Sequence, residues 1–158
     1  MLTMRIIKYK TRLTEDRKAV LEKEVSVYCP EVDKVMNSPE KVVKLARNFL
    51  RMHEETEEYL YMVCMNVKLE MTSVFEISHG NVNSSVVGVR EIFQKALLAN
   101  AVNIIMMHNH PSGDTKPSRE DIEVTKRLVE AGKIIGVDVI DHIIIGKNYC
   151  SLKEAGYL

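Results

Sequence analysis

The stretch VNIIMMHNHPSGDTKPSRED, residues 102–121, sets the expected fold and the candidate chemistry of this 158-residue chain. It begins with an apolar run of strand length over 102–107, continues through a turn-rich polar loop over 109–117, and enters an amphipathic helix. Two histidines, His108 and His110, stand where the strand ends. A strand that leads through a short loop into a helix is typical of proteins that mix both elements.

The flanking segments continue this alternation of strands and helices. Strands are predicted over 59–65, 72–78 and 137–145, helices over 39–51 and from 89 to 97, a turn-prone loop over 80–85, and the end of the helix after residue 118 at Gly132 or Gly136. Helices interleaved with strands predict an α/β fold with one mixed central β-sheet flanked by helices.

The start of the chain is less regular than the rest. We predict an N-terminal extension over 1–35, followed by a single domain over 36–158. Residues 4–13 alternate apolar and charged side chains, as a half-buried strand does. The charge-rich segment 14–24 is interpreted as a short helix.

Composition limits the possible classes of function. Hydrophobic residues make up 46% of the chain, and 22 Lys and Arg balance 22 Asp and Glu. A net charge of zero argues against nucleic acid as the default partner, because binding to phosphates needs excess positive charge. The cysteines Cys29, Cys64 and Cys150 form no C-x-x-C pair and are expected to be free thiols. We see no export signal and no apolar run of about 20 residues, which predicts a cytoplasmic protein without a membrane span.

The two histidines form a candidate metal site with a carboxylate further along the chain. Side chains in a strand repeat with a period of two, so the imidazoles of His108 and His110 point the same way. Asp121 lies in the first turn of the helix that Ser118 opens, and the turn over 111–114 can fold that helix back toward the strand. Two imidazoles and one carboxylate suit tetrahedral Zn²⁺ with one open position. Water in that position reaches a pKa of about 7 and becomes a usable nucleophile.

Each part of this pattern also has a simpler explanation. His-x-His pairs are common on protein surfaces, and Ser118-x-x-Asp121 fits a capping box in which Asp121 only satisfies backbone donors. The conjunction of strand end, turn and helix start favours the metal site, because Ser118 can cap the helix while Asp121 faces a metal. Other zinc signatures fail, since His53-Glu54-Glu55-Thr56-Glu57 lacks the second histidine of H-E-x-x-H.

Residues 108–121 resemble the signature of the RadC family, and they fit the wider JAMM (MPN+) metalloprotease motif of H-x-H, seven residues, Ser, two residues, Asp. The resemblance extends through Asp141-His142-Ile143-Ile144-Ile145-Gly146 and back through Arg90-Glu91 to the strand that follows Glu58. It covers about residues 36 to 158. It implies a JAMM/MPN-like fold, with a mixed sheet in a cytidine deaminase-like three-layer arrangement, and a zinc cofactor.

The resemblance also implies roles for individual residues. The implied zinc ligands are His108, His110 and Asp121. Ser118 would hydrogen-bond the developing oxyanion, and Glu58 would take a proton from water and pass it to the leaving amine. Glu57 is the alternative position for this proton carrier. His142 is interpreted as a structural residue or a support for a ligand rather than as a ligand, because three protein ligands suffice.

The activity that the resemblance implies is zinc-dependent cleavage of a peptide or isopeptide bond in a protein or peptide substrate. One alternative is a non-catalytic, metal-containing module that binds protein or DNA, as the family's association with DNA repair suggests. A metal-dependent nuclease is a weaker alternative, against which the neutral charge argues. Longer family members carry an N-terminal helix-hairpin-helix module, and nothing before Ser38 offers its glycine-containing hairpin. A homo-oligomer is compatible with the sequence.

Overall fold

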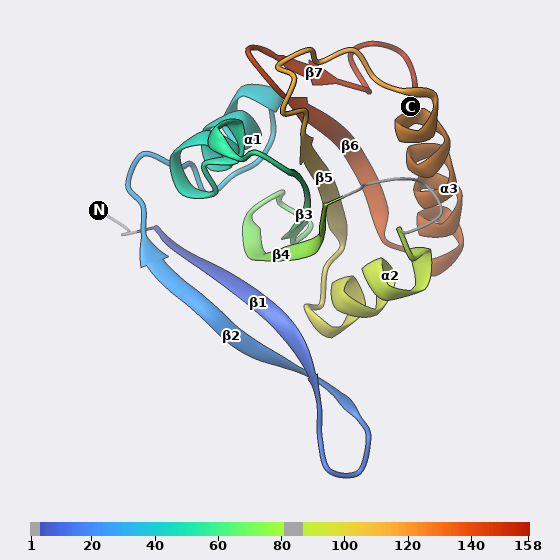
Figure 1. Ribbon diagram of the computed structural model, residues 1–158. Coiled ribbons are helices and arrows are strands. Elements are labelled where there is room, and N and C mark those ends of the chain that lie inside the picture. The colour runs from blue at the N-terminus through green and yellow to red at the C-terminus, as the bar shows by residue number, and fades with distance from the viewer. Residues whose placement is uncertain (1–3, 81–86) are drawn as a thin grey trace.

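The computed structural model describes residues 4–80 and 87–158, and a seven-stranded mixed sheet runs through its middle (Figure 1). The order of the strands is β2-β1-β4-β3-β5-β6-β7. The strands are β1 (Arg5–Leu13), β2 (Ala19–Tyr28), β3 (Glu58–Met65), β4 (Met71–Gly80), β5 (Asn103–Asn109), β6 (Asp138–Ile145) and β7 (Tyr149–Ser151). The helices are α1 (Pro39–Lys44), which continues as the π-helical η1 (Leu45–Phe49), the 3₁₀ turn η2 (Met52–Glu54), α2 (Val89–Leu98) and α3 (Arg119–Ile135).

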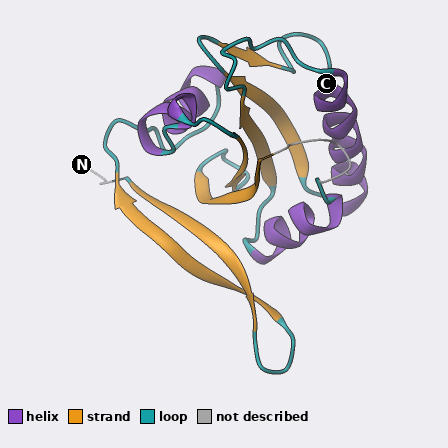
Figure 2. Ribbon diagram, viewed as in Figure 1, coloured by secondary structure: helices purple, strands orange, loops and turns teal. Residues whose placement is uncertain are grey.

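Helices cover both faces of the sheet, with α1 on one side and α2 and α3 on the other (Figure 2). Alternate residues of β5 supply the two cores, because side chains alternate across a strand. Ile105 and Met107 pack with α1, whereas Ile104 and Met106 pack with α2 and α3. The predicted α/β class, with a mixed central sheet flanked by helices, is confirmed.

The mixed pairing follows from the connections between strands. β3 pairs antiparallel with both β4 and β5, whereas β5 pairs parallel with β6. A parallel pair needs a crossover, and α3 supplies it between β5 and β6. The carboxyl ends of β5 and β6 therefore lie side by side, next to the N-terminus of α3. Clefts at such strand ends are common binding sites in α/β sheets.

The charge-rich segment 14–24 is not a helix, so that interpretation was wrong. Its first residues form a tight turn, in which Arg17 has a φ of 65°, and Ala19 then begins β2. β1 and β2 make a long hairpin, and β1 also pairs parallel with β4 (Figure 1). Alternating charges on a half-exposed strand resemble those on a short polar helix, and the pairing partner decides between them. The division into an extension and a domain stays a prediction.

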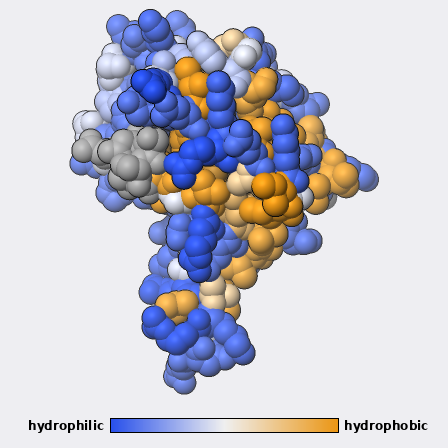
Figure 3. Space-filling view, turned by 90° about the vertical axis from the view of Figure 1, so that its right-hand side faces the viewer, coloured by the Kyte–Doolittle hydropathy of each residue, from blue (hydrophilic) through white to orange (hydrophobic). Residues whose placement is uncertain are grey.

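The remaining predicted elements agree with the structure apart from small shifts at their ends. The helix expected over 39–51 becomes α1 and η1, and Arg51, with a φ of 52°, begins the next turn. Of the loop expected over 80–85, Gly80 ends β4 and the rest lies outside the described residues. Among the described helices, none is long and apolar enough to cross a membrane. Seen from the side of α2 and α3, the surface mixes charged and apolar side chains, with Leu97 and Ile134 among the exposed ones (Figure 3).

Candidate metal centre

Three donor groups converge at the carboxyl end of β5. Nε2 of His108 lies 2.9 Å from Nε2 of His110 and 3.3 Å from Oδ1 of Asp121. Nε2 of His110 lies 3.5 Å from Oδ2 of Asp121. Ligands bound to tetrahedral zinc at about 2.0–2.1 Å are themselves about 3.3 Å apart. The spacing of these three groups therefore fits a zinc ion, as the sequence predicted for these residues.

The capping box and the metal site turn out to be the same structure. The Asp121 N–H donates to Oγ of Ser118 over 3.0 Å, and the Ser118 N–H donates to Oδ2 of Asp121 over 2.7 Å. This reciprocal pair fixes the start of α3. It also holds the Asp121 carboxylate against the two imidazoles, so the helix cap positions a candidate ligand.

The loop between β5 and α3 orients His110. The Gly113 N–H donates to the carbonyl of His110 over 2.9 Å, which closes the predicted turn. Gly113 has a φ of 83°, a conformation that favours glycine. Nδ1 of His110 lies 2.7 Å from the carbonyl of Asp114 and must donate to it, because a carbonyl can only accept. Nε2 of His110 is therefore the unprotonated nitrogen of the neutral ring, and it faces the centre.

A buried chain of hydrogen bonds orients His108 in the same way. The hydroxyl of Thr125 donates to the carbonyl of Asp121 over 2.6 Å, so its oxygen must accept from Nδ1 of His142, 2.6 Å away. Nε2 of His142 then accepts from Nδ1 of His108 over 2.7 Å. Burial lowers the pKa of His142 well below its usual value, which keeps this ring neutral. His108 therefore also turns an unprotonated Nε2 toward the centre.

The electrostatics of the centre favour a cation. With both Nδ1 atoms protonated, two Nε2 lone pairs face one another beside a carboxylate, and a cation or a proton must lie between them. Asp121 raises the pKa of His110, against the opposing effect of burial. Burial works to raise the pKa of Asp121, but hydrogen bonds with His108 and His110 outweigh it and hold this pKa well below its usual range. Asp121 is therefore an anion wherever the protein is folded near neutral pH.

One side of the centre opens to a cavity of about 370 Å³. Its lining consists of Glu58, His110, Pro111, Ser112, Ser118, Glu120 and Asp121. Glu58 is half-buried at the start of β3, whereas Glu57 is exposed, with Oε2 4.0 Å from Nε2 of His79. The structure thus brings Glu58 and Ser118 into one cavity with two of the candidate ligands.

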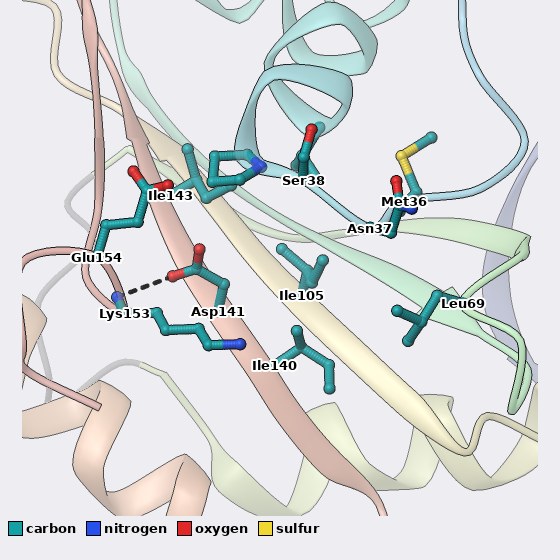
Figure 4. Close-up of a pocket in the computed structure, with 12 residues that line it drawn as sticks. Met36, Asn37, Ser38, Leu69, Ile105, Ile140, Asp141, Ile143, Lys153 and Glu154 are labelled. Carbon is teal, nitrogen blue, oxygen red and sulfur yellow. Dashed lines mark hydrogen bonds between the residues drawn. The ribbon is translucent and has the colours of Figure 1, made fainter.

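A separate cavity, also of about 370 Å³, lies on the α1 face of the sheet (Figure 4). Its lining is mostly apolar, and its buried carboxylate, Asp141, already accepts bonds from Ser151 Oγ and from the N–H groups of His142 and Lys153. This carboxylate ties β6 to the end of the chain.

The sequence analysis did not identify Thr125. Its signal was present, because Thr125 follows Asp121 by four residues and residues with this spacing share one face of a helix. His142 was assigned a supporting role only through the family resemblance, and the chain of hydrogen bonds now gives the physical basis of that role.

Comparison with known proteins supports the same assignment. A family model described as a RadC-like JAB domain matches residues 36–157. The chain is 40% identical over 139 residues to a UPF0758 protein of Methanosarcina barkeri, covering 87% of this chain and 60% of that protein. It is 49% identical over 123 residues to a UPF0758 protein of Caldanaerobacter subterraneus, covering 77% and 52%. The chain thus spans only 52–60% of the length of these two relatives. The resemblance seen in residues 108–121 is confirmed.

Proposed function

Because the chain belongs to the family of RadC-like JAB domains, we propose that it is a metallohydrolase that uses Zn²⁺ to cleave a peptide or isopeptide bond in a protein substrate. The observation that carries this proposal is the convergence of His108, His110 and Asp121 at tetrahedral spacing, with both imidazole tautomers fixed by hydrogen bonds. Neutral imidazole and carboxylate are preferred zinc ligands. Fixed tautomers raise the affinity of such a site.

The donor set suits a catalytic rather than a structural zinc. Structural zinc sites are closed by four protein ligands, whereas catalytic sites have three and keep one position open. Here three ligands converge, and the cavity beside His110 and Asp121 gives access to the fourth position. When bound, Zn²⁺ polarises a carbonyl group and lowers the pKa of water to about 7.

Glu58 is the proton carrier in this proposal. It lines the cavity with His110, Ser118 and Asp121, and it is half-buried. Its carboxylate accepts a proton from the attacking water and donates it to the leaving amine. Such general acid–base catalysis contributes a factor of about 10² to 10⁴. Glu57 is the weaker candidate, because its carboxylate is exposed and turned toward His79.

Ser118 stabilises the oxyanion that forms on the substrate. Its oxygen accepts from the Asp121 N–H, which leaves the hydroxyl proton free to donate. Ser118 lines the cavity, so this proton can reach a substrate oxygen there. One side chain therefore caps α3 and serves the reaction.

The test is a hydrolysis assay of the zinc-loaded protein on a panel of fluorogenic peptides and isopeptide-linked substrates, with two matched variants. Glu58→Gln should lower kcat by about 10² to 10⁴-fold and retain zinc. Glu57→Gln, a change of the same kind at the neighbouring residue, should leave kcat near the wild-type value. If the wild type cleaves nothing in the panel, or if both variants match it, the proposal fails and a non-catalytic binding module becomes the better account.

A further inference from the structure

We propose that Asn109, which lies between the two histidine ligands on β5, is a positioning residue that holds Glu58 beside the metal centre. This inference rests on the proposed function of Glu58. Nδ2 of Asn109 donates to the carbonyl of Glu57 over 2.9 Å, and Oδ1 accepts from the N–H of Tyr59 over 2.7 Å. The Asn109 amide therefore binds the backbone on both sides of Glu58.

The amide takes over where the backbone pairing stops. The ladder between β3 and β5 has its last pair at Leu60 and His108. Beyond that pair, the side chain of Asn109 supplies both the donor and the acceptor that a neighbouring strand would supply. The backbone of Asn109 carries a ligand on each side, and its side chain carries the backbone of Glu58. A single residue thus links the position of the ligands to that of the proton carrier.

The chemistry of this contact requires an amide. A carbonyl needs a donor and an N–H needs an acceptor, and a primary amide offers both at the spacing of one backbone unit. Asn109 is only 2% exposed, so water cannot easily replace it. Without these two bonds, β3 stays in the sheet, because Glu58 also pairs with Gly80 of β4. The expected effect of losing the amide is a displaced Glu58 in a folded protein.

A displaced proton carrier predicts a specific kinetic signature. A misplacement of about 1 Å can cost about 10²-fold in rate. We expect Asn109→Ala to lower kcat by about 10 to 100-fold while zinc content and KM change little. In the Glu58→Gln background the same substitution should cause no further loss, because the group that it positions is already gone. A structural residue would instead lower the rate again in that background.

A spectroscopic experiment tests the inference without a substrate. The full chain is loaded with Co²⁺, and the pH midpoint of its visible absorption spectrum is measured for the wild type, Glu58→Gln, Asn109→Ala and the double variant. This midpoint responds to a carboxylate beside the open coordination position. The matched control is Asn103→Ala, because Asn103 is a buried asparagine at the other end of β5 that donates to the carbonyl of Asn66. Asn109→Ser replaces Asn109→Ala if the latter does not fold.

We expect Glu58→Gln and Asn109→Ala to shift the midpoint in the same direction, the double variant to match Glu58→Gln, and Asn103→Ala to match the wild type. An unchanged midpoint in Asn109→Ala, with a shift in Glu58→Gln, overturns the inference and leaves the proposed function standing. If Glu58→Gln does not move the midpoint, or if the wild type binds no Co²⁺, the proposed function fails and the inference fails with it.

Discussion

Two clusters of histidine and carboxylate in this molecule have similar spacing and different organisation. The metal cluster consists of His108, His110 and Asp121, and the surface cluster consists of Glu57, Glu76 and His79. Nδ1 of His79 lies 3.2 Å from Oε1 of Glu76, and its Nε2 lies 4.0 Å from Oε2 of Glu57. The ion-pair distances in the metal cluster, 3.3 and 3.5 Å, fall in the same range.

The difference lies in what each imidazole nitrogen contacts. In the surface cluster the two nitrogens of His79 face two separate carboxylates, so the groups do not converge on one point. In the metal cluster each ring donates from Nδ1 to another residue and keeps Nε2 for the centre. The His79 side chain is 56% exposed, whereas that of His108 is 1% exposed. The comparison teaches that fixed tautomers and burial, rather than proximity, distinguish a metal site from a charged surface.

The largest expected effect is the loss of a ligand from the metal cluster. His110→Ala should lower the affinity for Zn²⁺ by more than about 100-fold, which exceeds the usual effect of losing a residue that only supports a ligand. Competition with a chromogenic chelator measures this affinity. The control, His53→Ala, removes an exposed histidine that pairs only with a carboxylate, and it should bind zinc as the wild type does. Equal affinities for the two variants would contradict the comparison.

A smaller loss is expected when the tautomer of His108 is no longer fixed. Thr125→Val keeps the shape of the side chain and removes the oxygen that accepts from Nδ1 of His142. We expect zinc affinity to fall by about 10 to 100-fold. Thr72→Val is the matched control, because the Thr72 hydroxyl donates to the carbonyl of Cys64 in another part of the sheet. Unchanged affinity in Thr125→Val would show that burial alone organises the cluster.

The pH dependence of metal binding follows from the direction of the pKa shifts. Asp121 raises the pKa of His110 above its usual 6.5, so in the metal-free protein the proton remains on this ring above pH 6.5. Zinc must displace that proton, and affinity therefore falls as pH decreases, by about tenfold per pH unit once His110 is protonated. Asp121 adds no proton in this window, because its pKa lies well below its usual range. Titration calorimetry between about pH 5.5 and 8 measures this slope. Affinity that does not change with pH would exclude His110 as a ligand.

The smallest effect is expected in the surface cluster. His79→Ala should change the free energy of unfolding by no more than about 0.5 kcal/mol, because exposed ion pairs contribute little. Urea denaturation of the metal-free protein measures it, and zinc affinity should equal that of the wild type. A weaker zinc affinity in His79→Ala would mean that the two clusters are coupled, and the comparison would need revision.

Residues 102–121 predicted most of the metal centre because its geometry is local. The strand period aligns His108 with His110, and the capping box places Asp121 at the start of α3. The partners of these ligands come from distant segments, which spacing along the chain does not reveal. His142 on β6 lies 34 residues from His108, and the backbone that Asn109 binds is about 50 residues away. Such contacts depend on the order of the strands.

The N-terminal hairpin shows the opposite limit. The sequence predicted β1 from its alternation, but the helix proposed over 14–24 is replaced by a turn and β2. β2 is an edge strand with exposed, charged side chains, so it lacks the apolar periodicity that identifies buried strands. Its conformation depends on pairing with β1, from Arg5 opposite Tyr28 to Leu13 opposite Ala19.

X-ray absorption spectroscopy at the zinc edge tests the central claim most directly, because it reports the ligands of the bound ion. For the protein loaded with one equivalent of Zn²⁺, the account predicts a four-coordinate shell of nitrogen and oxygen at about 2.0–2.1 Å with the scattering signature of two imidazoles. His108→Ala/His110→Ala should lose that signature. A shell that contains sulfur, or one with no more than a single imidazole, would contradict the assignment of His108, His110 and Asp121 as the metal centre.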